Sequence, residues 1–582
     1  MADDYAASTA TTGELAAAGG FLAGAIEEAG DRDWFRVSLE AGARYQFYLD
    51  GAQITVGNVP GGTLPDPVLR LLDGAGNVIA VSDNGSGRNG MINFTAPQAG
   101  VYYLEAGSAV AGESGSYTIS LRPFATAQQI GDYIAGAARP ASFTINISAL
   151  SATEQAFALR ALDLYREVCR ISYTVVTGPA DLTFDNSGTG VAVGGPTRVQ
   201  ISSSFVDSPE FASRAFKIYM HEIGHALGLR HSGPYNGGNV RVGVDNVFAN
   251  DMSQLSVMTY FGWREQPLAD RVLTPQMADI YAVQKLYGAN ETTRLGDTVY
   301  GFGSTAGAIY DFATYGGNVG YTIYDSGGTD TFDVSGFAMN QVVDLTPGAW
   351  SSVGGYVENI GVYLTSVIEN AVGGSGRDTI TGNAADNALY GRAGDDVIAG
   401  GGGRNYLRGD EGNDTITGGT DFDDINGNAG DDRASGGDGD DWVVGGKDQD
   451  VLFGDAGGDI VYGNLGDDTL QGGAGADIVR GGQGDDSVQA GAGDDWISGD
   501  RGSDTLAGGA GADVFHTFAE AGIDRVTDFN AAEGDRVQLL AGASYTASQV
   551  GADVVVQTGP GAQLVLVGVL LSSLPAGWLF GA

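Results

Sequence analysis

Residues Gly481–Gln489 read GGQGDDSVQ, and this nine-residue unit recurs without a slip from Gly373 to His516. In its 16 consecutive copies the first position is Gly in 15, the sixth is Asp in 14, and the eighth is Val, Ile, Leu or Phe in 15. Glycines permit tight turns that leave carbonyl oxygens free. The Asp adds a carboxylate, and the single apolar residue points into a thin core. Because one copy buries almost nothing, the copies must stack.

At this length the pattern resembles the RTX repeat of calcium-binding parallel β-rolls. The resemblance implies that sixth-position carboxylates bind calcium, and the predicted ligands are Asp378, Asp396, Asp414, Asp432, Asp441, Asp459, Asp468, Asp477, Asp486, Asp495 and Asp504. The block has 29 acidic and 8 basic residues, a net charge of −21. We expect it to be unfolded without calcium and folded with it. A Gly/Asp-rich disordered linker would not keep the eighth position apolar.

A second pattern, HEIGHALGLRH, begins at His221 and holds three of the four histidines in the chain. On a helix, His221 and His225 lie on one face. Gly228 then permits a turn that brings back His231 as a third nitrogen ligand. We predict that the three histidines bind one Zn²⁺ at a site open to water, with Glu222 as the base. Such spacing is improbable by chance in a chain so poor in histidine.

This motif resembles the metzincin protease signature. The later stretch Ser256–Tyr260 resembles the Met-turn of that group, in which a methionine, here Met258, forms an apolar floor under the ligands. Tyr260 narrows the resemblance to the serralysin family. The resemblance implies that Tyr260, like the tyrosine at this position in that family, is a labile extra zinc ligand that swings to stabilise the oxyanion. Taken without the histidines, both residues would be assigned to core packing.

Two further segments, Arg294–Gly301 and Asp325–Thr331, resemble serralysin segments that close a calcium site between the protease lobe and the C-terminal part. The implied ligands are carbonyl oxygens of the first segment joined by residues of the second: Arg294, Gly296, Thr298, Asp325, Gly327 and Asp330. Carbonyl and carboxylate oxygens suit Ca²⁺, which takes six to eight such ligands.

The N-terminal part predicts an all-β unit. Alternating apolar runs separated by turn residues favour a small β-sandwich, with strands expected at 34–39, 45–49, 68–72, 101–105 and 117–121. The stretches DRDWF from Asp31, DPVLRL from Asp66 and AGVYYL from Ala99 resemble the bacterial pre-peptidase domain found beside secreted proteases. That resemblance implies an accessory domain and no second active site.

The whole chain therefore predicts a multidomain α+β protein. We assign 1–124 to the pre-peptidase-like sandwich, 125–140 to a linker with a short helix, 141–293 to a metzincin catalytic α/β domain, and 294–582 to the β-roll with its terminal strands and secretion region.

Local sequence signals predict the strands and helices of the catalytic domain. Strands are expected at 142–146, 171–176, 181–184 and 199–203, and the Gly-rich run 188–195 predicts an exposed sheet edge. Ser151 and Glu154 form a capping box for a helix that ends at Val168. Two Pro signals predict further helix starts: Ser208 caps the motif helix and Thr274 caps a helix over 276–287.

The composition of the chain excludes several classes of protein. The net charge of −43 repels nucleic acid and anionic membranes. One cysteine, Cys169, excludes an internal disulfide framework and is expected to be a buried, inert thiol. The chain contains no apolar run of 18 residues or more, so no membrane span is predicted. The N-terminal residues carry no conventional signal peptide, whereas the repeats imply type I secretion from a Gram-negative cell. The last residues, from Gly577, depart from the family's usual ending.

The resemblance covers the chain from about Ser142 onward, and it implies a secreted zinc endopeptidase acting on extracellular proteins, stabilised by several Ca²⁺ ions and passed out by a type I exporter. The alternative is a calcium-dependent cell-surface or surface-layer-associated binding protein in which proteolysis is secondary. An inactive adhesive or toxin-like relative is disfavoured by the intact ligand set and Glu222.

Overall fold

The structure is a computed structural model that describes residues 5–16, 20–28, 30–51, 63–82, 90–110, 113–187, 190, 192–206, 208–235, 246–261 and 271–581. Contacts divide the chain into two compact units, Met1–Asn290 and Glu291–Ala582. Within the described ranges, no helix is both long and apolar enough to cross a membrane.

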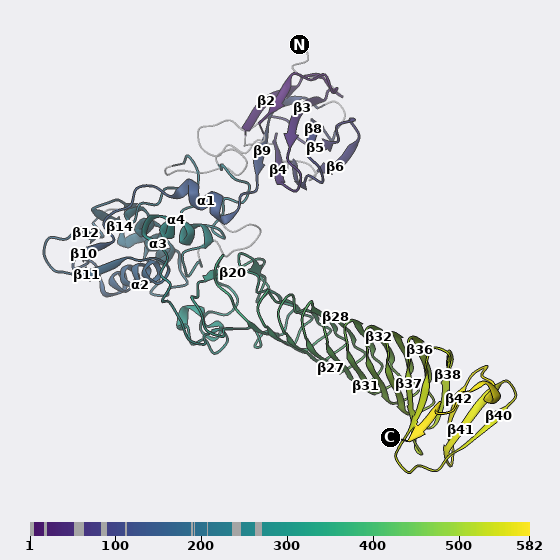
Figure 1. The fold of residues 1–582 in the computed structure, drawn as a ribbon. Coiled ribbons are helices and arrows are strands. Elements are labelled where there is room, and N and C mark those ends of the chain that lie inside the picture. The colour runs from purple at the N-terminus through teal and green to yellow at the C-terminus, as the bar shows by residue number, and fades with distance from the viewer. Residues whose placement is uncertain are drawn as a thin grey trace. The chain divides into compact units, whose positions relative to one another are not determined.

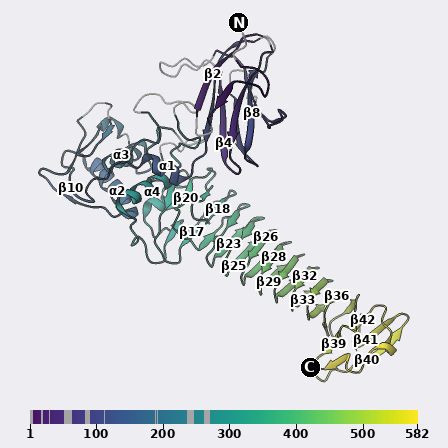
Figure 2. The ribbon, with the colours of Figure 1, turned by 45° about the horizontal axis from the view of Figure 1, so that its top comes forward.

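The first unit begins with the predicted β-sandwich (Figure 2). One sheet has the order β1 (Gly13–Leu15), β3 (Asp33–Leu39), β8 (Gly100–Ser108), β5 (Pro67–Leu72) and β6 (Val78–Ser82). The other has the order β2 (Gly20–Ile26), β9 (Gly115–Pro123), β4 (Arg44–Asp50) and β7 (Gly90–Thr95). Alternate side chains of β3 are buried, and Phe35, Phe47 and Leu104 are fully enclosed in the core. Each of the five predicted strands is present.

A second lobe of the first unit follows, with a mostly parallel five-stranded sheet. Its order is β11 (Ser172–Val175), β10 (Ser142–Asn146), β12 (Leu182–Asp185), β14 (Arg198–Ile201) and β13 (Ala192–Gly194). Only β13 runs antiparallel to its neighbour. It forms the sheet edge expected from the Gly-rich run, of which residues 188, 189 and 191 lie outside the described residues.

The α-helices described in this lobe are α1 (Ala127–Ile134), α2 (Ala152–Val168), α3 (Arg214–Ala226) and α4 (Met277–Tyr287). The capping box of Ser151 and Glu154 starts α2 as predicted. The short helix expected in the linker is α1, and it packs closely on α4, since a side chain at Gly131 would meet Tyr281. Cys169 is buried at the end of α2, where burial raises its pKa to about 12.

Two predicted helix starts are wrong. Ser213, not Ser208, caps α3 by accepting the N–H of Phe216. Ser208 accepts the N–H of Glu210 in a bend, and the aromatic packing of the following residue, Phe211, on Phe157 and Phe216 holds that bend before the helix.

The N-cap of α4 is Gln276, whose N–H donates to Asp279; Thr274 lies two residues too early. A Ser/Thr–Pro pair reports only the local preference for a helix start. At α3 the packing of Phe211 overrides that preference, and at α4 the capping box of Gln276 and Asp279 does.

The second unit is a parallel β-roll of two 13-stranded sheets, visible as stacked strands in Figure 1. One sheet contains β15 (Val299–Gly301), β17 (Thr331–Asp333), β21 (Asn370–Val372), β23 (Ala388–Ala393), β25 (Tyr406–Glu411), β27 (Asp424–Ala429), β29 (Trp442–Lys447), β31 (Ile460–Leu465), β33 (Ile478–Gln483), β35 (Trp496–Arg501), β37 (Val514–Thr517), β39 (Arg536–Leu539) and β43 (Leu579–Gly581). The other contains β18 (Val342–Asp344), β22 (Thr379–Thr381), β24 (Val397–Ala399), β26 (Thr415–Gly419), β28 (Arg433–Asp438), β30 (Val451–Ala456), β32 (Thr469–Ala474), β34 (Ser487–Ala492), β36 (Thr505–Ala510), β38 (Ile523–Val526), β42 (Ala562–Leu566), β41 (Asp553–Gly559) and β40 (Thr546–Val550).

The register explains the nonamer. Each copy forms one strand, and successive copies alternate between the sheets, so that Leu407 pairs with Ile425 in the next turn of the same sheet. The eighth-position side chains, among them Leu407, Ile425 and Val443, are fully buried between the two sheets. The predicted roll and the multidomain α+β class are confirmed.

Shorter elements frame the roll. Between its first strands lie α5 (Phe312–Tyr315) and a small sheet of β16 (Tyr321–Ile323), β20 (Ile360–Val362) and β19 (Trp350–Ser351). At the far end, β40, β41 and β42 pair antiparallel. They are terminal strands of the kind predicted for the last part of the chain.

Candidate functional site

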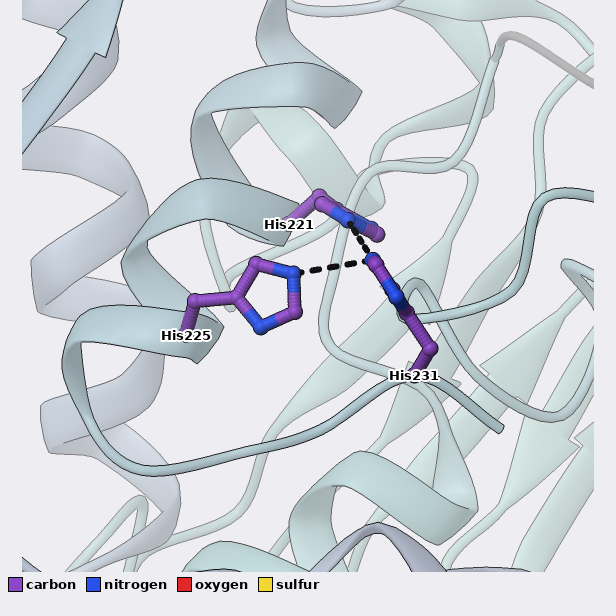
Figure 3. Close-up of side chains that lie close together, drawn as sticks. All are labelled: His221, His225 and His231. Atoms are coloured by element: carbon purple, nitrogen blue, oxygen red, sulfur yellow. Dashed lines mark hydrogen bonds between the residues drawn. The ribbon is translucent and has the colours of Figure 1, made fainter. Parts of the chain in front are cut away.

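Three imidazoles converge at the end of α3 (Figure 3). His221 and His225 project from one face of the helix, and His231 returns from the chain that follows it. The Nε2 atom of His231 lies 3.2 Å from Nε2 of His221 and 3.0 Å from Nε2 of His225. The sequence spacing predicted this cluster.

Backbone carbonyls orient all three rings. The Nδ1 atoms lie 2.7, 2.9 and 2.8 Å from the carbonyl oxygens of Val257, Leu229 and Tyr235, in the order of the histidines. Because a carbonyl oxygen only accepts, each Nδ1 carries the proton and donates. The three Nε2 lone pairs therefore face one another with no proton between them, which is the donor set of a three-histidine Zn²⁺ site with its outer hydrogen bonds in place.

Burial also keeps these rings neutral. It lowers the pKa of His221 well below its usual value and the pKa of His231 to about 4. The pKa of His225 is lowered for the same reason. Neutral imidazole is the form that binds a metal, so the cavity favours ligation over protonation.

Gly228 makes the turn that returns the third ligand. Its φ is +99°, and a Cβ there would lie 2.1 Å from the carbonyl oxygen of Ala137. Both the conformation and the close approach require glycine. The turn predicted at Gly228 is confirmed.

Glu222 lies beside the ligands and lines the same cleft. Its side chain is buried, and burial raises the pKa of the carboxyl to about 7, opposed by a hydrogen bond from the Gly194 N–H. A carboxyl group whose pKa lies near neutral pH can both accept and return a proton, as a general base and acid must.

Met258 forms the floor expected of a Met-turn. Its side chain is fully buried, and its Sδ lies so close under α3 that a Cβ at Gly224 would approach it to 2.6 Å. The turn is held by Asp279 of α4, which accepts hydrogen bonds from Ser256 Oγ at 2.6 Å and Val257 N–H at 2.8 Å.

Sequence reasoning missed Asp279, although it positions the carbonyl of Val257 that orients His221. It also missed Asp251, which accepts hydrogen bonds from Ser232 Oγ at 2.5 Å and Tyr235 OH at 3.0 Å. Asp251 therefore fixes the loop whose carbonyl orients His231. Neither acid belongs to a recognisable motif, so no local signal marked them.

Tyr260 lies beside the histidine cluster. Its ring centroid is 4.5 Å from that of His231 and 5.7 Å from that of His221, and 37% of the residue is exposed. A ring that only packed in the core would be enclosed, as Met258 is. Its exposure on the cleft leaves it accessible to a bound substrate.

Glu222, His225, His231 and Tyr260 line one cleft of about 710 Å³. It is lined by Tyr133, Ala192, Val193, Gly194, Glu222, His225, Leu229, Arg230, His231, Gly233, Pro234, Tyr235 and Tyr260. The sheet edge β13, the motif helix and the loop after His231 thus contribute to the same cavity. Its size suits several residues of an extended peptide.

The predicted calcium residues near the start of the second unit are also brought together. Asp330 Oδ1 accepts the Thr298 N–H at 2.8 Å, while its buried Oδ2 has no hydrogen-bond partner. Burial raises the pKa of Asp330 to about 7. Asp325 accepts the Gly327 N–H at 2.9 Å and the Tyr300 hydroxyl at 2.6 Å.

In the same place, the Gly296 carbonyl lies 2.9 Å from Thr298 Oγ1, and Arg294 adopts a φ of +53° while its guanidinium donates to the Tyr324 carbonyl. A buried carboxylate oxygen without a hydrogen-bond partner, close to backbone carbonyls of the same site, fits a hard cation such as Ca²⁺.

The sixth-position aspartates form two ladders along the roll. In most rungs one carboxylate oxygen accepts the N–H of the Asp 18 residues earlier, as Asp459 Oδ1 does from Asp441 at 2.8 Å. Asp423 accepts instead from the Asn405 N–H, and Asp378 from the Gln341 N–H. The other oxygen is buried without a hydrogen-bond partner in every predicted calcium-ligand residue of the block except Asp378, whose Oδ2 accepts the Gly374 N–H. Burial raises the pKa of Asp441 to about 7 and of Asp486 to about 8.

This arrangement is costly unless a cation is bound, since a buried carboxylate with an unused oxygen loses its hydration. The ladder therefore fits calcium. Four aspartates absent from the predicted ligand set share the geometry: Asp423, Asp450, Asp513 and Asp524. The first three also occupy sixth positions, so the repeat itself could have identified them.

Asn387 and Asn405 occupy the two sixth positions that lack Asp, and their amides close the rungs differently. Asn387 Nδ2 donates to the Glu369 carbonyl at 2.9 Å, and Asn405 Nδ2 donates to the Gly403 carbonyl at 3.1 Å. In the Asn405 rung Oδ1 keeps the ladder bond, from the Asn387 N–H, and the amide NH2 group stands where the Asp rungs have the unused oxygen.

Comparison with known proteins agrees with this site and fold. A family model described as Peptidase M10 serralysin C terminal matches residues 289–541, and one described as Bacterial pre-peptidase C-terminal domain matches residues 31–108. The chain is 35% identical over 335 residues to metalloprotease AprA of Pseudomonas entomophila (strain L48), covering 52% of this chain and 67% of that protein.

It is 32% identical over 360 residues to metallopeptidase AprA of Pseudomonas marginalis, covering 56% of this chain and 71% of that protein. It is 45% identical over 189 residues to serralysin of Proteus mirabilis, covering 31% of this chain but only 38% of that protein.

The fold and the site are those of the metalloprotease class that carries a parallel β-roll. The chain belongs to the serralysin family, with a pre-peptidase C-terminal domain near its N-terminus. Both family resemblances inferred from the motifs are thereby confirmed.

Proposed function

We propose that the protein is a secreted zinc endopeptidase that hydrolyses peptide bonds of extracellular proteins. The observation that carries the proposal is the convergence of three Nε2 atoms, each oriented through its Nδ1 by a carbonyl, in one cleft with Glu222. The relatives named serralysin and metalloprotease support it.

In this proposal His221, His225 and His231 hold Zn²⁺, which when bound would act as a Lewis acid toward water and the substrate carbonyl. Glu222 accepts the proton of the attacking water and then donates it to the leaving amine. Tyr260 donates its hydroxyl proton in a hydrogen bond to the developing oxyanion. The cleft holds the peptide beside these groups.

A casein-cleavage assay tests the proposal. Removal of zinc with a chelator that leaves calcium bound should abolish cleavage, and added Zn²⁺ should restore it. Cleavage that persists with no zinc bound would refute the proposal.

The role of Tyr260 has its own test. Tyr260→Phe should lower kcat about 10- to 1000-fold with little change in KM, as for the loss of one oxyanion donor. Steady-state kinetics on a peptide substrate measure both constants. An unchanged kcat would assign the ring to packing against His231 alone.

We propose that calcium binds the ladder and the Arg294–Asp330 site, and that the predicted domain limits describe the chain. An unfolded, acidic roll suits passage through a type I exporter, and external calcium would then fold it. The partnerless carboxylate oxygens support this coupling.

The two Asn rungs give a prediction about calcium number. Asn405→Asp should increase the calcium bound per chain after dialysis, because it adds the missing carboxylate to the ladder. In chelator the variant should melt at a lower temperature, because it replaces a satisfied amide with a buried charge. Asn413→Asp, an exposed change at a fifth position, is the matched control and should alter neither value. Equal calcium content in the two variants would contradict the assignment.

A further inference from the structure

The charge of the cleft comes from few groups. Besides histidines and tyrosines, the cleft is lined by two ionisable residues among those described, Glu222 and Arg230. Arg230 is thus the one Lys or Arg in the described lining. It stands between Leu229, whose carbonyl orients His225, and the ligand His231. A cation is therefore built into the wall next to the reacting groups.

The backbone of Arg230 is fixed from both sides. Its N–H donates to the Ile134 carbonyl at 2.8 Å, and the Gly136 N–H donates to the Gly228 carbonyl at 3.0 Å. Leu229 and Ala135 form a bridge between the same two segments. The wall that carries Arg230 is thus tied to the end of α1.

The side chain also has a defined path. A Cβ at Gly136 would lie 3.1 Å from Nε and 3.4 Å from Cγ of Arg230, so the side chain runs along the bare backbone of this glycine. Arg230 is nevertheless exposed, and no acid among the described residues forms an ion pair with it. By contrast, Arg32, Arg70 and Arg198 each bind a carboxylate.

The chain has 72 acidic and 29 basic residues. The negative field of such a protein repels acidic peptides. Only a local cation offsets that repulsion, and guanidinium binds carboxylates through two parallel hydrogen bonds.

We propose that Arg230 is a specificity residue that selects substrates with an acidic side chain close to the cleaved bond. The inference rests on the proposed peptidase function and names its substrate class. Arg230 recognises the carboxylate of Asp or Glu, while Glu222 and Tyr260 act on the peptide group.

Matched fluorogenic peptides that carry Glu, Gln or Lys at single positions flanking the cleaved bond test this inference. The wild-type protein should cleave one Glu peptide about 2- to 5-fold faster in kcat/KM than its Gln twin, the range expected of an exposed charge pair. High salt should reduce the ratio.

Arg230→Gln should bring the ratio to about one, and Arg230→Glu should favour the Lys peptide instead. Arg214→Gln is the matched control, because it removes an exposed arginine of α3 that does not line the cleft. Its ratio should equal that of the wild type. A reversed preference in Arg230→Glu cannot result from misfolding, which would lower all three rates together.

A wild-type ratio of one at every position, or a preference that survives in Arg230→Gln, would overturn the inference while leaving the peptidase function intact. Absence of zinc-dependent cleavage of every peptide would instead overturn the proposed function, and this inference with it.

Discussion

Glu222→Ala should abolish casein cleavage while zinc stays bound. Only the proton acceptor is removed, because the three ligands are oriented by Val257, Leu229 and Tyr235 rather than by Glu222. Loss of a general base costs roughly 100- to 10,000-fold in rate. We expect a loss at the upper end, since this group serves in two proton transfers.

The measurement is bound zinc together with casein turnover on the same preparation. Stability should not fall in the isosteric Glu222→Gln, because burial already disfavours the ionised carboxylate. Glu210→Ala, an exposed change upstream of α3, is the control and should cleave casein normally. Near-normal cleavage by Glu222→Ala with zinc retained would remove the residue from the mechanism.

Removal of calcium should unfold the roll. A fragment of residues 291–582, which matches the second compact unit, should show little β signal by circular dichroism in chelator and a steep gain on addition of millimolar calcium. In chelator the buried carboxylates repel one another and leave one oxygen each without a partner. Calcium supplies that partner and bridges adjacent turns, so folding should be cooperative along the roll.

Magnesium should substitute poorly, because it requires tight octahedral geometry. Two variants in one nonamer sharpen the test. Asp441→Asn removes a buried rung and should raise the calcium concentration needed for folding, whereas Asp438→Asn makes the same charge change at an exposed position and should not. A fragment equally folded in chelator and in calcium would show that the aspartates serve another purpose, and the secretion argument would lose its physical basis.

Local sequence signals are enough to encode the roll and the histidine cluster. A nine-residue period with one apolar position has a single good solution, two sheets stacked around a thin core, and it specifies the 18-residue register seen between Leu407 and Ile425. Helical spacing placed His221 and His225 on one face, and the positive φ of Gly228 returned His231. These features are local, so neighbouring residues suffice to encode them.

The groups that orient the histidine rings, and the cation on the cleft wall, depend on tertiary structure. Asp279 contacts Val257 across 22 residues of chain, and Asp251 contacts Ser232 across 19. The shift of the α3 cap to Ser213 follows from the packing of Phe211, and the position of Arg230 on the cleft wall follows from its pairing with the end of α1. Such contacts depend on how distant segments pack, because burial and hydrogen-bond geometry exist only once the chain has folded.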